Sequence, residues 1–195
     1  MRKIPYIYDN PLDNLFYELS EITSPYAYSI GFTPNMITTL SNIACIITIL
    51  LLLNANYYWA ALFVLIAFYF DCMDGYMARK YKMYSSFGDY YDHISDYIKT
   101  ISILVVLYYI DSNKFYNIIP ILVLLVIMLE FHMGCQELLS DGDNVSDTLE
   151  STKKFCPVKN NNDINGIKNA ISSTKLFGPG TFQIALALSI VYYDY

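Results

Sequence analysis

The chain has 195 residues, of which 55% are hydrophobic and only 15% are charged, and its mean hydropathy is +0.33. Soluble domains carry about 25% charged residues, so this composition argues against a water-soluble globular enzyme, and it excludes a disordered chain. The net charge of -6 argues against nucleic acid as a partner, because phosphate binding requires a basic surface. The length fits one domain, and we expect residues 1–195 to form a single membrane domain.

The first predicted element is a short amphipathic helix over residues 9–24. Asp9 or Asn10 can cap it, and Pro11 suits its first turn. Apolar side chains recur at helical spacing on one face: Leu12, Leu15, Phe16 and Leu19. Such a helix either lies in the membrane interface or packs against the rest of its own protein.

Apolar segments then alternate with short polar connections. They predict membrane spans at about 35–53, 57–79, 88–110, 115–133 and 179–194, with a polar cytoplasmic loop at 134–174. The first is uncharged over a length that crosses a hydrocarbon core of about 30 Å. A lipid-exposed backbone must satisfy its hydrogen bonds within each segment. The predicted fold is therefore an all-α integral membrane protein, a bundle of five to six transmembrane helices with an N-terminal juxtamembrane amphipathic helix.

Basic residues mark the expected orientation in the membrane. Most lie in segments that share one side of the predicted bundle: Arg2, Lys3, Arg79, Lys80, Lys82, Lys153, Lys154, Lys159, Lys168 and Lys175. The opposite connections hold only Lys114, so the positive-inside rule places the N-terminus, the 79–88 segment and the long loop in the cytoplasm. We expect the host membrane to be that of the endoplasmic reticulum if the chain is eukaryotic or comes from a virus of a eukaryotic host. It is the inner membrane if the chain is bacterial.

The cysteines do not predict a metal site. The four cysteines show no C-x-x-C spacing, and with only two histidines the chain does not resemble a zinc protein. Cys45 and Cys72 fall in apolar stretches, where we expect reduced and buried thiols.

Segment 71–96 carries four aspartates with helical phasing. Asp71 and Asp74 share one helix face, and Gly75 and Ala78 continue the same stripe. Arg79 borders this stripe and offers a guanidinium fork suited to phosphate. The small residues leave room for a ligand to approach the backbone.

A matching stripe is expected on the next helix, where Gly88, Asp92 and Asp96 are each separated by four residues. Four unpaired carboxylates in a membrane would cost on the order of 10 kcal/mol, and only Arg79 and Lys99 are basic partners at matching depth. The carboxylates therefore need a multivalent cation or a water-filled cavity. Oxygen ligands without Cys or His suit Mg²⁺, Mn²⁺ or Ca²⁺, and with an arginine they indicate chemistry on a metal-bound phosphate ester.

These residues fit the pattern D-x-x-D-G-x-x-A-R-x8-G-x3-D-x3-D from Asp71 to Asp96, with both long spacings intact. The pattern resembles the CDP-alcohol phosphotransferases (phosphatidyltransferases), integral membrane enzymes of phospholipid synthesis. The start of the first span, Thr33-Pro34-Asn35 followed by Thr38, is also similar to that family. The resemblance covers about residues 10–110.

The resemblance implies a membrane transferase that moves a phosphoalcohol group from a CDP-alcohol donor to an acceptor alcohol and releases CMP. It implies metal ligands for one or two Mg²⁺ or Mn²⁺ ions at Asp71, Asp74, Asp92 and Asp96, with Asp96 also the catalytic base on the acceptor hydroxyl. It implies substrate contacts at Asn35, Thr38, Gly75, Ala78, Arg79, Ser85 and Gly88. Family members have six transmembrane helices, often as homodimers in membrane lipid, whereas the sequence here shows five spans.

Several alternatives stay open at this point. The Asp92–Asp96 stretch resembles the choline and ethanolamine phosphotransferases, whereas the short chain resembles enzymes that transfer a phosphatidyl group from CDP-diacylglycerol. The competing functions are an inactive metal-binding scaffold of the same fold and a cation transporter that uses the acidic residues as its path. The transporter gives Arg79 no role. We expect His93 to lie beside the site and Asp89 to be solvated.

Overall fold

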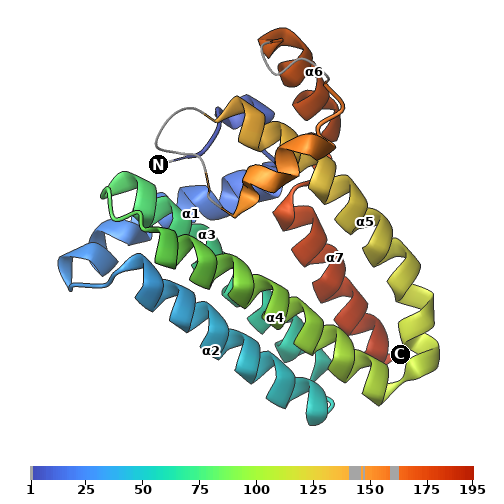
Figure 1. Cartoon of the computed structure of the whole chain (residues 1–195). Coiled ribbons are helices and arrows are strands. Elements are labelled where there is room, and N and C mark those ends of the chain that lie inside the picture. The colour runs from blue at the N-terminus through green and yellow to red at the C-terminus, as the bar shows by residue number, and fades with distance from the viewer. Residues whose placement is uncertain (1, 141–145, 147, 159–162) are drawn as a thin grey trace.

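The structure, a computed structural model, describes residues 2–140, 146, 148–158 and 163–195, and this part of the chain is helical without strands (Figure 1). Its α-helices are α1 (Pro11–Ser29), α2 (Pro34–Leu53), α3 (Tyr57–Lys80), α4 (Ser86–Ile110), α5 (Ser112–Leu139), α6 (Ile164–Thr174) and α7 (Pro179–Val191). Short 3-10 helices are η1 (Tyr6–Tyr8), η3 (Leu149–Phe155), η4 (Lys175–Phe177) and η5 (Tyr192–Asp194).

Five helical segments of the described chain are long and apolar enough to cross a membrane. They are α2, α3, α4, α5 and the stretch Ile164–Asp194, which contains α6 and α7. Many of their large apolar side chains point outward, among them Leu53, Ile121 and Leu188. Lipid is the solvent that makes such exposure favourable. The predicted all-α integral membrane bundle is therefore confirmed.

Helix α1 begins where the sequence predicted and ends later. The Asn10 side chain accepts a hydrogen bond from the Leu12 N–H at 2.8 Å, and Pro11 opens the first turn. The helix continues past Pro25 to Ser29 rather than ending near residue 24. Gly31 ends it in the left-handed conformation (φ 87°), where the Phe32 N–H bonds to the Ala27 carbonyl at 3.0 Å.

The polar segment 134–174 is not a simple loop, and that prediction is wrong for its described parts. Helix α5 extends to Leu139, and η3 and α6 follow it. A Cys135–Cys156 disulfide joins η3 to α5, and a Cβ at Gly134 would collide with the Thr152 carbonyl oxygen. Residues 141–145, 147 and 159–162 of this segment, Lys159 among them, lie outside the described residues.

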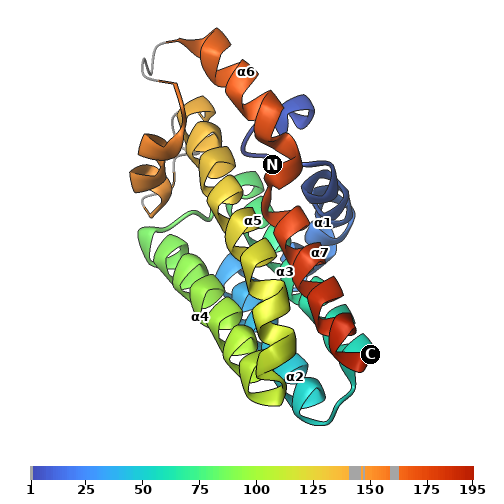
Figure 2. The same cartoon turned by 90° about the vertical axis from the view of Figure 1, so that its right-hand side faces the viewer.

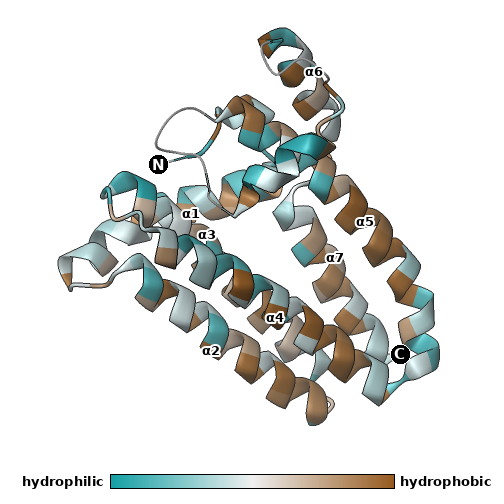
Figure 3. Cartoon of the chain, in the orientation of Figure 1, coloured by the Kyte–Doolittle hydropathy of each residue, from teal (hydrophilic) through white to brown (hydrophobic). Residues whose placement is uncertain are grey.

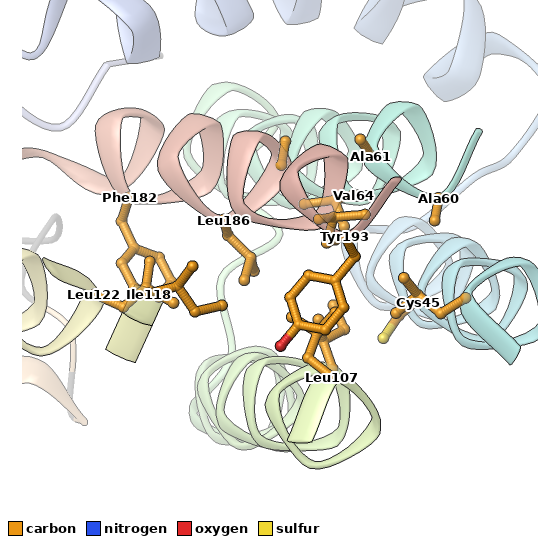
Figure 4. Packing of buried hydrophobic residues seen from close by; sticks show 14 residues of the cluster. Cys45, Ala60, Ala61, Val64, Leu107, Ile118, Leu122, Phe182, Leu186 and Tyr193 are labelled. Atoms are coloured by element: carbon orange, nitrogen blue, oxygen red, sulfur yellow. The ribbon is translucent and has the colours of Figure 1, made fainter. Parts of the chain in front are cut away.

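The bundle has an apolar end and a polar end. The main core joins all five spans around Leu52, Val64, Leu107, Leu122 and Leu186 (Figure 4). Hydrophilic residues gather at the other end, over α1 and the segment before α6 (Figure 3). The N-terminal segment and the α3–α4 connection lie at this polar end, and α6 extends beyond it from the start of α7 (Figure 2).

Candidate active site

A cavity of about 390 Å³ lies at the polar end of the bundle, between α1, α2, α3, α4, α5 and α7. Every residue predicted for the site lines it: Asn35, Thr38, Asp71, Asp74, Gly75, Ala78, Arg79, Ser85, Gly88, Asp92 and Asp96. Apolar side chains from α5 and α7, including Val126, Leu129 and Phe182, form another part of the wall. The cavity therefore combines carboxylates with a lipid-compatible surface.

Two antiparallel helices carry the aspartates. Asp71 and Asp74 lie near the end of α3, and Asp92 and Asp96 lie near the start of α4. Ser85 caps α4 by accepting a hydrogen bond from the Gly88 N–H at 3.0 Å. Helix α2 packs against both α3 and α4, and the cavity lies between the two aspartate-bearing faces.

Three of the four carboxylates form one group. Asp71, Asp92 and Asp96 each offer an oxygen, and these oxygens lie within 4.8 Å of one another. The Oδ1 atom of Asp92 is buried without a hydrogen-bond partner. A buried acceptor of this kind needs a partner, and oxygen ligands suit hard divalent cations. The donor set thus fits a divalent ion.

Asp74 stands outside this group. Its carboxylate is buried and accepts a hydrogen bond from the Thr38 hydroxyl at 2.6 Å. Thr38 also donates to the Pro34 carbonyl at 3.2 Å, in the first turn of α2. The structure therefore ties the fourth predicted ligand to α2 rather than to the other three carboxylates.

Lys99, which the sequence predicted only as a basic partner at matching depth, is a site residue that the predicted site did not include. Its ammonium group lies 3.0 Å from Asp71 Oδ1 and 2.7 Å from Asp96 Oδ1, and it donates to the Ser41 hydroxyl at 2.7 Å. Its spacing of three residues from Asp96 was the available signal, because such residues share a helix face. Lys99 holds one carboxylate from each aspartate pair.

Glycines leave space beside the polar groups. A Cβ at Gly75 would lie 3.3 Å from the guanidinium nitrogens of Arg79. A Cβ at Gly88 would lie 2.8 Å from the Asn35 side-chain oxygen. The Arg79 side chain reaches α1, where its Nη2 atom lies 3.5 Å from the Tyr17 hydroxyl. Side chains at either glycine would displace groups that line the cavity.

Asp89 is not solvated, and that prediction is wrong. Its carboxylate accepts hydrogen bonds from the Ser146 hydroxyl at 2.7 Å and the Thr148 N–H at 2.9 Å. These partners lie 57 and 59 residues further along the chain, so no local pattern announces them. His93 lines the cavity beside the carboxylates, with its Nδ1 atom 2.8 Å from the Asp89 carbonyl oxygen.

The N-terminal segment also reaches the site, which the sequence analysis missed. Lys3, Asp9, Asp13 and Tyr17 line the cavity. Lys3 forms a buried ion pair with Glu137 of α5. The available signal was the polar residues of the 9–24 segment, among which the sequence predicted only a helix cap at Asp9 or Asn10.

Comparison with known families decides the relationship. The sequence model of the CDP-alcohol phosphatidyltransferase family matches residues 32–148, more than half of the chain. The chain belongs to the CDP-alcohol phosphatidyltransferase family. The matched part of this phosphatidyltransferase-family protein runs from just before α2 to beyond the end of α5 and includes the four aspartates. No curated protein and no solved structure matches the chain.

Membership carries two general properties. The family's enzymes are transferases that act on CDP-alcohols, and they depend in general on a divalent metal. The acidic group in the cavity is consistent with that dependence. The five apolar helices agree with the family's place in the membrane.

Proposed function

We propose that this protein transfers a phosphoalcohol group from a CDP-alcohol to an acceptor alcohol and releases CMP. The observation that carries the proposal is the group formed by Asp71, Asp92 and Asp96, whose carboxylate oxygens lie within 4.8 Å of one another on a cavity wall. Arg79 on the same wall supplies a planar cation for phosphate. A cation transporter has no use for that arginine in its path.

In the proposed reaction the acceptor oxygen attacks the phosphorus of the phosphoalcohol group, and the bond from this phosphorus to the CMP oxygen breaks. Asp96 takes the proton of the acceptor hydroxyl as general base. Asp71, Asp92 and Asp96 would hold Mg²⁺ or Mn²⁺, with Asp74 beside them, and a bound ion supplies charge neutralisation for the pyrophosphate. Lys99 holds Asp96 and Asp71 in position.

The remaining predicted residues bind the donor. Arg79 pairs with its phosphate oxygens, while Gly75, Ala78 and Gly88 give the nucleotide close access to the backbone. Asn35, Thr38 and Ser85 offer hydrogen-bonding side chains from the two neighbouring helices. The apolar wall from α5 and α7 would take the acyl chains of a lipid substrate.

The test is CMP release by the full chain, purified in detergent with Mn²⁺. The donors are CDP-diacylglycerol and, separately, CDP-choline or CDP-ethanolamine. The acceptors are inositol, serine, glycerol phosphate and diacylglycerol. Release from one pairing, absent in Asp92→Asn, supports the transfer and names the acceptor. Binding of CDP-alcohol and Mn²⁺ without release from any pairing would support the inactive scaffold instead.

A further inference from the structure

A second polar wall of the cavity takes no part in the proposed chemistry. Asp9 and Asp13 both line the cavity, and they are only 3% and 4% exposed. Neither belongs to the group of Asp71, Asp92 and Asp96. Buried carboxylates are rare in proteins unless they are paired or bind a ligand, so these two require an explanation.

The chain holds this wall in a fixed position. Asn10 donates hydrogen bonds to the Lys175 carbonyl at 2.8 Å and the Thr181 hydroxyl at 2.9 Å. Asp13 Oδ1 accepts a hydrogen bond from the Gly180 N–H at 2.6 Å, at the first turn of α7. The N-terminal segment is therefore fastened to the start of α7, and the carboxylates face a preformed cavity.

Asp9 has an unused acceptor. Its Oδ1 atom accepts a hydrogen bond from the Asn10 N–H at 2.9 Å, but its buried Oδ2 atom has no hydrogen-bond partner. Leaving such an acceptor unsatisfied costs about 1–3 kcal/mol, and more for a charged group. The atom therefore points to a ligand that donates a hydrogen bond.

The charges around Asp9 favour a cationic donor. Burial raises the pKa of Asp9 to about 6, although Arg2 and Arg79 act to lower it. Burial also raises the pKa of Asp13 well above its usual value, and the nearby Asp9 carboxylate raises it further. Lys3, the other cation on this wall, is paired with Glu137. The basic side chains around this wall thus do not offset the cost of burying its carboxylates.

We propose that Asp9, with Asp13 beside it, binds the primary ammonium group of an amino-alcohol substrate. The inference rests on the proposed function and names a class of substrate for it. A primary ammonium has three N–H donors, one of which satisfies Asp9 Oδ2. A quaternary ammonium has none and is bound instead by aromatic faces. The ammonium belongs either to a free acceptor or to the head group that a CDP donor carries.

The experiment compares the wild type with Asp9→Asn and with Glu21→Gln, an exposed acid-to-amide change on α1, the helix that follows Asp9. Binding to the full chain with Mn²⁺ in detergent is measured by calorimetry for ethanolamine, serine, choline, inositol and CDP-ethanolamine. We expect ethanolamine or serine to bind the wild type and Glu21→Gln better than choline or inositol does. In Asp9→Asn their affinity falls roughly tenfold or more, as loss of a hydrogen bond to a charged group predicts.

The different ligands in this experiment distinguish the possible results. Selective loss with the free amino alcohols assigns the ammonium to the acceptor, and loss with CDP-ethanolamine alone assigns it to the donor. Equal binding of ethanolamine by the wild type and Asp9→Asn, or better binding of inositol or choline, overturns the inference. Retained Mn²⁺ binding shows that Asp9→Asn is folded. Binding needs no turnover, so a missing CMP release would reject the proposed function without deciding the subsite.

Discussion

At the scale of single residues, Lys99 neutralises part of the negative charge of the three-carboxylate group. Its ammonium contacts Asp71 at 3.0 Å and Asp96 at 2.7 Å, and both are proposed metal ligands. Two like charges 4 Å apart repel by about 4 kcal/mol at an effective dielectric constant of 20. A bound divalent ion and Lys99 therefore compete for the same oxygens.

We predict that Lys99→Met strengthens Mn²⁺ binding by at least roughly tenfold, because a tenfold change needs only about 1.4 kcal/mol of the repulsion that the substitution removes. The same change slows transfer, since Asp96 loses the group that positions it. Electron paramagnetic resonance titration of Mn²⁺ measures the affinity, with the exposed Lys154→Met as control. Weaker Mn²⁺ binding in Lys99→Met would show instead that the lysine assembles the ligands.

Asp9 makes a prediction about pH. Its pKa of about 6 lies above the unfolded value near 3.8 because of burial, while Arg2 and Arg79 partly oppose the shift. The folded protein therefore holds the proton more tightly, and stability is lost as the pH rises from about 4 to 6. Asp9→Asn should raise the stability at pH 7.5 by up to roughly 3 kcal/mol and change little at pH 4. Melting temperatures at both values test this, and a lower melting temperature of the variant at pH 7.5 contradicts it.

At the scale of elements, α1 buries its polar face and exposes its apolar face, the reverse of an ordinary surface helix. It buries Asp13, Asn14, Ser20 and Ser24 against the bundle. Its outward face carries Leu15, Leu19 and Ile22. The periodicity predicted an amphipathic helix but left open which face was inside. The structure has the polar face packed on the protein, so the apolar face is available to the membrane interface.

This orientation reverses the usual expectation for substitutions on α1. Ser20 is fully buried, whereas Ile22 is 64% exposed. Ser20→Leu should destabilise the protein by about 1–3 kcal/mol through overpacking. Ile22→Ser should change stability by less than about 0.5 kcal/mol in detergent, as exposed positions do. Thermal melts of the two purified variants make the comparison, and the opposite ranking would mean that α1 is rotated.

The η3 segment depends on a covalent link that its sequence did not reveal. Cys135 and Cys156 are joined across 21 residues, whereas Cys45 and Cys72 are free and buried, as their apolar surroundings predicted. Leu149 and Thr152 of η3 line the cavity. The link therefore fixes part of the cavity wall to α5.

We predict that Cys156→Ser lowers the stability by about 2–4 kcal/mol, the usual effect of removing a disulfide. It should also raise the KM for substrate, because η3 loses its attachment to α5. Cys45→Ser is the matched control that leaves the link intact. An unchanged melting temperature of Cys156→Ser would show that packing alone holds η3.

At the scale of the whole molecule, the part of the site that could be predicted comes from residues close together in the sequence. The aspartate stripes follow from helical spacing within residues 71–96, so their meeting on one cavity could be inferred without a structure. The N-terminal wall could not, because the Asp13–Gly180 contact joins residues 167 positions apart. Helix α6 was not predicted either. Only two of its side chains, Ile167 and Ile171, are buried, and so few apolar positions give no clear helical periodicity in the sequence.

Two signals disagree about which side of the membrane the site faces. The basic residues of the polar end predict a cytoplasmic site by the positive-inside rule. The Cys135–Cys156 disulfide lies at the same end, and disulfides are typical of oxidising compartments. We give the charge distribution more weight, because it sums many residues in several connections, and propose a cytoplasmic site.

Labelling of sealed membrane vesicles whose cytoplasmic face points outward tests this orientation. Asn54 is exposed at the α2–α3 turn, and Ser172 is exposed on α6 at the polar end. In these vesicles a membrane-impermeant maleimide should modify Ser172→Cys directly and modify Asn54→Cys only after permeabilisation. The reverse pattern would place the site on the oxidising side, where the disulfide forms spontaneously and the CDP-alcohol would have to be supplied across the membrane.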